Sequence, residues 1–99
     1  MILGWFGSAD AKAFGSSLAA FYAERIPVEA PLNEKKFRAK TGEVLEKMAR
    51  QVREYQAAHK VGVYAKAQIG NAFKWTLKDA GYDDEYIERL TLWLVRAFR

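Results

Sequence analysis

The chain has 99 residues and a net charge of +4, and 51% of its residues are hydrophobic while 28% are charged. This composition indicates one globular domain over residues 1–99, since so short a chain has no room for two cores and lies far from the disordered range. The sequence contains no cysteine, which excludes disulfides, thiolate nucleophiles and cysteine-based zinc sites and fits a reducing cytosol.

Residues 1–7, MILGWFG, form a short apolar N-terminal segment. No basic residue precedes the apolar run, and the run is shorter than the roughly 7–15 residues of a secretory signal or the roughly 20 of a membrane-spanning helix. We therefore expect a cytoplasmic protein in which this segment is available to cover the core.

The first predicted helix covers residues 9–26. Ser8 or Asp10 can serve as its N-cap, and Pro27 ends it. Its larger apolar residues share one face: Ala11, Phe14, Leu18, Phe21, Tyr22 and Ile26. Its back carries small residues, which would let another helix approach closely: Ala13, Ser16, Ala19, Ala20 and Ala23.

A linker with two prolines, residues 27–33, leads to the second predicted helix at 34–60. Apolar and amphipathic residues recur on one stripe of this helix: Phe37, Thr41, Val44, Leu45, Met48, Val52, Tyr55 and His59. At 1.5 Å per residue the helix would be about 40 Å long. We expect it either to bend near Thr41 and Gly42 or to project at one end.

Two shorter helices complete the predicted fold. Gly62 separates the second helix from the third, at 63–80, and Gly81 suits the third helix's C-terminus. The last helix, at 84–98, has Asp83 as N-cap and two acids in its first turn. Short links favour antiparallel packing of the second helix with the third and of the third with the fourth. The sequence therefore predicts an all-α, single-domain bundle of about four helices, with the second helix longest.

Basic residues concentrate in the second helix. Residues 34–60 contain eight Lys or Arg and four Glu, so they carry the whole net charge of +4. A nucleic-acid partner would use this excess through Lys36, Lys40, Lys47, Arg50 and Arg53. However, acids lie within the same polar arc at i,i+4 spacing, which predicts the pairs Glu43–Lys47, Glu46–Arg50 and Arg50–Glu54. A solvated helix face explains this pattern better, and nucleic-acid binding is the alternative.

Residues suited to catalysis or metal binding are sparse. His59 is the only histidine, and its place on the apolar stripe near a helix end indicates a partly buried, hydrogen-bonded structural role. Helix capping accounts for the acidic run at 83–88. The sequence contains no phosphate-binding loop, nucleophile with an obvious base, or dinucleotide fingerprint. We therefore predict a non-enzyme with no cofactor and no metal.

The third helix carries a second stripe outside its apolar face, formed by Tyr64, Gln68, Asn71 and Trp75. An aromatic at each end with two amides between suits a recognition patch for a peptide or a helix. The alternative is structural, with Trp75 tucked under the first helix and Tyr64 covering the edge of the core.

The last helix is apolar on nearly all sides. Its broad core face comprises Tyr86, Ile87, Leu90, Trp93, Leu94, Ala97 and Phe98. Leu92 and Val95 fall on the opposite side, where a surface helix is normally polar. Self-association or another protein partner ranks first as the explanation, because an exposed apolar patch calls for one. The second explanation is that the N-terminal segment folds back and covers Leu92 and Val95 with Trp5 and Phe6. A membrane surface ranks last, because the flanking acids oppose anionic lipid.

Taken together, these patterns predict a small non-catalytic helical protein-interaction domain. It would form a homodimer or bind another protein through Leu92, Val95 and the stripe of Tyr64, Gln68, Asn71 and Trp75.

Overall fold

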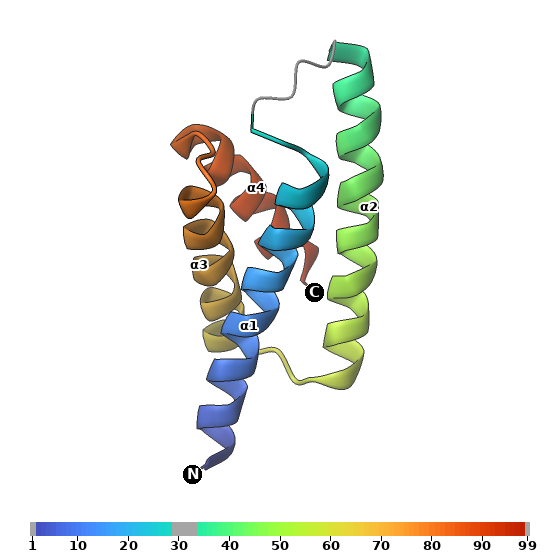
Figure 1. The fold of residues 1–99 in the computed structure, drawn as a ribbon. Coiled ribbons are helices and arrows are strands. Elements are labelled where there is room, and N and C mark those ends of the chain that lie inside the picture. The colour runs from blue at the N-terminus through green and yellow to red at the C-terminus, as the bar shows by residue number, and fades with distance from the viewer. Residues whose placement is uncertain (1, 29–33, 99) are drawn as a thin grey trace.

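The computed structural model describes residues 2–28 and 34–98, with side chains from residue 9 to 28 and from 35 to 98. Four helices occupy this part of the chain: α1 (Ile2–Arg25), α2 (Glu34–Ala58), α3 (Val63–Asp79) and α4 (Asp84–Ala97) (Figure 1). The described residues contain no strand. The predicted all-α class is confirmed, and α2 is the longest helix with 25 residues.

The start of α1 differs from the prediction. The helix begins at Ile2, so Ser8 and Asp10 lie within it and neither is its N-cap. The backbone of residues 2–7 continues α1 to the end marked N in Figure 1 and forms no separate segment. The predicted cover by Trp5 and Phe6 depends on side chains outside the described residues. Asp10 instead serves α2, because its carboxylate accepts a hydrogen bond of 2.6 Å from the Tyr55 hydroxyl.

The closest helix packing is between α1 and α3. A Cβ atom placed on Gly15 would lie 2.3 Å from the carbonyl oxygen of Ile69 and 3.1 Å from the Cβ of Ala72. One turn along, Ala19 is fully buried, and the Thr76 hydroxyl donates to the Ser16 hydroxyl at 3.2 Å. Of the small residues expected to admit a close neighbour, Ser16 and Ala19 lie at this contact, whereas Ala13 and Ala20 are exposed. The closest approach is at Gly15, which the expectation did not include, and the neighbour is α3.

The long helix α2 is continuous, and its first turns extend beyond the neighbouring helices. It runs unbroken through Thr41 and Gly42. The molecule is 50 Å long, and α2 lies along this dimension beside α1 (Figure 1). A helix of 25 residues is about 37 Å long, and its N-terminal end reaches past the ends of α3 and α4 (Figure 1). One stripe, with Val44, Met48 and Val52 at its centre, is buried in the core.

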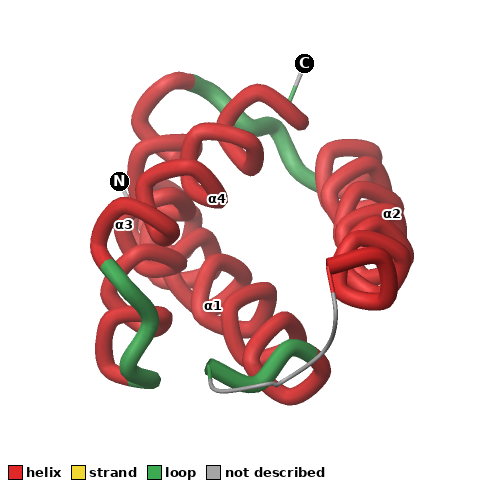
Figure 2. The backbone as a smooth tube through the Cα atoms, turned by 90° about the horizontal axis from the view of Figure 1, so that it is seen from above, coloured by secondary structure: helices red, strands yellow, loops and turns green. Residues whose placement is uncertain are grey.

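The order of the helices corrects one expectation. Within the described residues, α2 packs against α1 and α4 and does not pack against α3. Viewed along the bundle, α2 and α3 lie on opposite sides (Figure 2). The prediction that they are antiparallel neighbours was wrong because it used only the short link between them. The small residues of α1 allow α3 to pack closely on the other side of α1, and the link around Gly62 crosses the end of the bundle.

The turn between α3 and α4 follows the predicted capping chemistry. Gly81 has a φ of 99°, a left-handed conformation that favours glycine. The Gly81 N–H donates to the Lys78 carbonyl and the Tyr82 N–H to the Leu77 carbonyl, the two bonds of a Schellman motif. The Asp83 side chain then accepts from the N–H groups of Glu85 and Tyr86 and caps α4. These bonds set α3 and α4 as an antiparallel pair.

Three tyrosines join α1 to the start of α4. The hydroxyls of Tyr22 and Tyr86 are hydrogen bonded, and the Tyr82 hydroxyl donates to the Ile26 carbonyl. Ring centroids in this cluster lie 5.7 to 6.3 Å apart. Burial, reinforced by the neighbouring Tyr86, raises the pKa of Tyr22 far above its usual range and raises the pKa of Tyr82 to about 12. Tyr22 and Tyr82 are buried and belong to the core.

Candidate interaction face

The two apolar residues that sequence analysis placed on the outside of α4 differ in their surroundings. Ile87, Leu90 and Leu94 face the core and are buried, as expected. Leu92 is 50% exposed. Val95 is half-buried, because its side chain packs against α3: its Cγ2 lies 3.4 Å from the position that a Cβ on Gly70 would occupy. Leu92 is therefore an exposed apolar residue, as predicted, whereas Val95 partly belongs to the packing between α3 and α4.

The stripe predicted on α3 lies on the surface. Tyr64 is 66% exposed and Trp75 is 53% exposed, while Asn71 is exposed and Gln68 is half-buried. The structural alternative placed Trp75 under α1 and Tyr64 over the core, and neither arrangement is present. Both aromatic rings are thus available to a partner.

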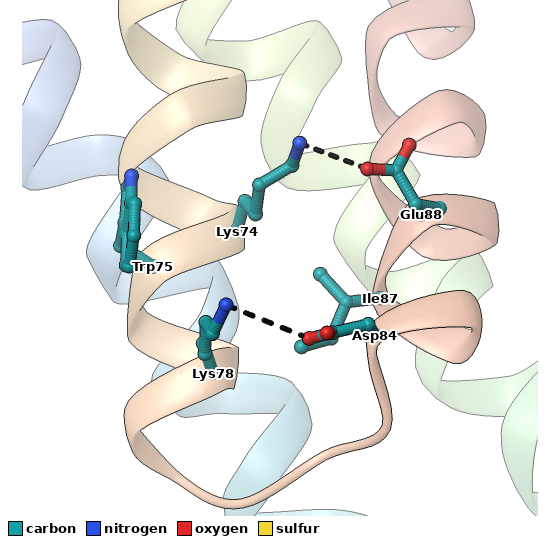
Figure 3. Close-up of a pocket in the computed structure, with 6 residues that line it drawn as sticks. All are labelled: Lys74, Trp75, Lys78, Asp84, Ile87 and Glu88. Atoms are coloured by element: carbon teal, nitrogen blue, oxygen red, sulfur yellow. Dashed lines mark hydrogen bonds and ion pairs between the residues drawn. The ribbon is translucent and has the colours of Figure 1, made fainter.

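A shallow hollow of about 280 Å³ lies at the junction of α3 and α4, and Trp75 is among the residues that line it. Two ion pairs cross this junction: the Lys74 ammonium lies 2.9 Å from Glu88, and the Lys78 ammonium lies 3.7 Å from Asp84 (Figure 3). The Lys78 ammonium is also 5.3 Å from the centre of the Trp75 ring, within cation–π range. Lysine side chains therefore connect the aromatic residue of α3 to the acidic start of α4.

A second hollow, of about 330 Å³, follows the same junction farther along α4. Leu92, Val95 and Thr91 line it together with Glu88 and Arg89, and Glu88 also lines the first hollow. Trp75 of the predicted stripe on one side, and Leu92 with Val95 on the other, thus line one continuous surface. We call it the α3–α4 face and define it by Asn71, Lys74, Trp75 and Lys78 of α3 and Glu88, Leu92 and Val95 of α4.

The contacts that hold this face together were not predicted from the sequence. The ion pairs between Lys74 and Glu88 and between Lys78 and Asp84 join residues 14 and 6 positions apart, which no helical repeat relates. The predicted turn at Gly81 provides the signal, since an antiparallel pair closed there brings these positions to the same level. The role of Gly70 in admitting Val95 has no such signal in a single sequence.

The predicted basic residues lie along the outer side of α2. Lys36, Lys40, Lys47, Arg50 and Arg53 are all exposed. Ion pairs between described residues include Arg25 with Glu24, His59 with Asp10, Lys74 with Glu88, Lys78 with Asp84 and Arg89 with Glu85. The i,i+4 pairs expected at Glu43–Lys47, Glu46–Arg50 and Arg50–Glu54 are not among them. Exposed long side chains gain little from such contacts, because ordering them costs entropy.

His59 is more exposed than predicted and has a defined structural role. Its ring stacks on Tyr55, which stacks on Phe14, with centroid separations of 4.1 Å in both cases. Its Nε2 lies 3.3 Å from Asp10, and its Nδ1 lies 3.1 Å from the Tyr55 carbonyl near the end of α2. Burial and the Asp10 carboxylate raise the pKa of Tyr55 well above its usual range. This cluster ties α2 to α1, and the hydrogen-bonded role predicted for His59 is present.

Comparison with known proteins adds no functional assignment. No family model, curated protein or solved structure matches the chain. Within the part of the chain that the structure describes, no helix is both long enough and apolar enough to cross a bilayer.

Proposed function

We propose that this chain is a small non-catalytic interaction domain that associates with a second copy of itself through the α3–α4 face. The observation that carries the proposal is the exposure of Trp75 and Leu92 on either side of one helix junction. Contiguous exposed apolar surface of this kind commonly marks a site that a partner covers. Aromatic and aliphatic residues of this kind commonly form the centre of protein interfaces.

The charges on the face are arranged in a way that supports burial. Lys74 and Lys78 already contact Glu88 and Asp84 within the chain. A partner that covers this region would therefore desolvate ion pairs, which costs less than burying isolated charges. The paired lysines can also lie against a partner with their aliphatic stems.

The test is the mass of the protein in solution, measured by sedimentation equilibrium over a wide concentration range at low and high salt. We expect a monomer–dimer equilibrium that persists at high salt, because an apolar interface is not screened. Leu92→Asp should shift the protein to monomer. Val28→Asp is the matched control, since Val28 is 47% exposed and lies outside the face. A monomer at every concentration would refute the proposal, as would equal effects of the two substitutions.

Nucleic-acid binding is the alternative function, and the exposure of all five predicted basic residues on α2 favours it. These charges follow one helix for about 25 Å, from Lys36 to Arg53, which suits a phosphate backbone. Opposing it, Glu43, Glu46 and Glu54 are exposed on the same helix.

One pair of variants separates the two functions. The double reversal Lys47→Glu and Arg50→Glu should abolish binding to a mixed-sequence DNA duplex and to single-stranded RNA while leaving self-association intact. Leu92→Asp should have the opposite effect. If the wild-type protein binds neither nucleic acid at low salt, the alternative is wrong.

A further inference from the structure

We infer that the two copies meet with their α4 helices antiparallel, about a two-fold axis that passes beside Leu92. This inference rests on the proposed self-association and specifies its geometry. It is drawn from two separate patterns, the charges along α4 and the side chains along α3. Both patterns have their centre at the same level of the helix pair.

The exposed charges of α4 are arranged around Leu92. Four carboxylates, at Asp83, Asp84, Glu85 and Glu88, precede Leu92, and Arg96 follows it. Arg89 also precedes Leu92, and its guanidinium lies 3.8 Å from Glu85 of the same helix. Glu88 and Arg96 lie four residues before and four residues after Leu92. When two copies pair antiparallel at Leu92, Glu88 of each copy is level with the partner's Arg96, whereas a parallel pair would set each of these charges beside its own copy.

The contacts of Gly70 relate α3 to this centre. The position of a Gly70 Cβ is 3.8 Å from the Cγ2 of Thr91 and 3.4 Å from that of Val95, so Gly70 lies level with Leu92. Along α3, Tyr64 lies six residues before Gly70 and Trp75 five residues after it, at about 9 and 7.5 Å along the helix.

The exposed stripe on α3 is therefore nearly symmetric about the same level. A two-fold axis there brings Tyr64 level with the partner's Trp75, and Gln68 level with the partner's Asn71. An aromatic residue then lies opposite an aromatic residue, and an amide opposite an amide. A parallel pair would instead set each residue opposite its own copy. One antiparallel axis thus gives complementary neighbours on both helices.

The size of the face sets the expected strength of the dimer. With 14 residues, α4 is about 21 Å long, and two packed helices are about 20 Å wide. A contact between two such surfaces falls at the small end of specific interfaces, where association is weak and reversible. The contacts of Glu88 with the partner's Arg96 add attraction that salt screens, so the dissociation constant should rise several-fold, without loss of the dimer, between low and high salt.

Single cysteines test the geometry directly, because the chain contains none of its own. Leu92→Cys lies on the axis in either orientation and should form a disulfide-linked dimer under mild oxidation. Glu88→Cys and Arg96→Cys each lie four residues from Leu92. In the antiparallel pair, each is about 12 Å along the helix from its own copy but level with the other position. Glu46→Cys, at an exposed position on α2, is the control that gives the background level of crosslinking by random collision.

With a bismaleimide shorter than this offset, neither Glu88→Cys nor Arg96→Cys should crosslink alone above the Glu46→Cys level. An equal mixture of the two should crosslink efficiently. If Leu92→Cys crosslinks but Glu88→Cys also crosslinks to itself, the orientation is parallel, and this inference fails while the proposed self-association stands. The inference also fails, and the proposed self-association stands, if Leu92→Cys crosslinks but the mixture of Glu88→Cys and Arg96→Cys crosslinks no more than the Glu46→Cys control. If Leu92→Cys stays monomeric and sedimentation shows no dimer, the proposed function fails as well.

Discussion

Replacing Gly15 by alanine tests the packing of α1 on α3. In this structure the new Cβ would lie 2.3 Å from the Ile69 carbonyl oxygen, whereas ordinary contacts begin at about 3.4 Å. The obstacle is backbone, so no side-chain rotation can relieve it. The two helices must separate by roughly 1 Å at their closest point, and the contacts on either side of it, including the hydrogen bond from Thr76 to Ser16, loosen with them.

The expected loss of stability is the difference between two effects. Overpacking of this kind costs about 1–3 kcal/mol. Alanine is favoured over glycine inside a helix by about 0.8–1 kcal/mol, which offsets part of the cost. We therefore expect Gly15→Ala to lower the free energy of unfolding by up to about 2 kcal/mol. For a domain of this size, that corresponds to a fall in Tm of up to about 15 °C.

Urea and thermal unfolding followed by circular dichroism measure this change, and Gly42→Ala is the matched control. Gly42 lies inside α2 with nothing within 4 Å of its Cβ position, so only the helix preference acts. We expect this control to be slightly more stable than the wild type. If Gly15→Ala were as stable as Gly42→Ala, the close approach of α1 and α3 would be wrong.

Three further changes test the α3–α4 turn and the tyrosine cluster. Asp83→Ala removes the cap of α4 and should lower the free energy of unfolding by about 1 kcal/mol in urea titrations, whereas Asp83→Asn should lower it less. Gly81→Ala forces alanine into a positive φ and should cost about 1–2 kcal/mol by the same assay; no change would argue against the Schellman motif. Tyr82 has a folded-state pKa of about 12 against about 10 when unfolded. Its contribution to the free energy of unfolding is therefore complete below about pH 10 and is lost as the pH rises toward 12. Thermal unfolding should show Tm falling over that range, and less steeply in Tyr82→Phe; equal slopes would contradict the assignment.

Much of the fold was predictable because its determinants are local. Apolar spacing located the helices, and Asp83 and Gly81 marked the α3–α4 turn through bonds to residues within five positions. The start of α1 was not predictable in the same way. Asp10 has the side chain of a cap, but Tyr55, 45 residues away, takes its carboxylate. The helix order also depends on a distant contact, between Gly15 and Ile69.

The candidate face was predictable as two separate residue sets but not as one surface. Helical periodicity identified Leu92 and the stripe from Tyr64 to Trp75 as lying outside the core, and their exposure agrees. Periodicity gives the direction of a side chain around one helix and nothing about the neighbouring helix. For this reason Val95 was placed in solvent although it packs beside Gly70.

The placement of α2 at one side of the bundle has a consequence for local stability. Since α2 borders α1 and α4 but not α3 in the described structure, it can separate while the contact between α1 and α3 stays closed. Such a partial opening exposes Val44, Met48 and Val52 and breaks the contacts of Asp10 with Tyr55 and His59. The amides of α2 should therefore exchange with solvent hydrogen earlier than those at the centre of α1 and α3. The bundle then consists of a three-helix unit of α1, α3 and α4, from which the long helix α2 separates first.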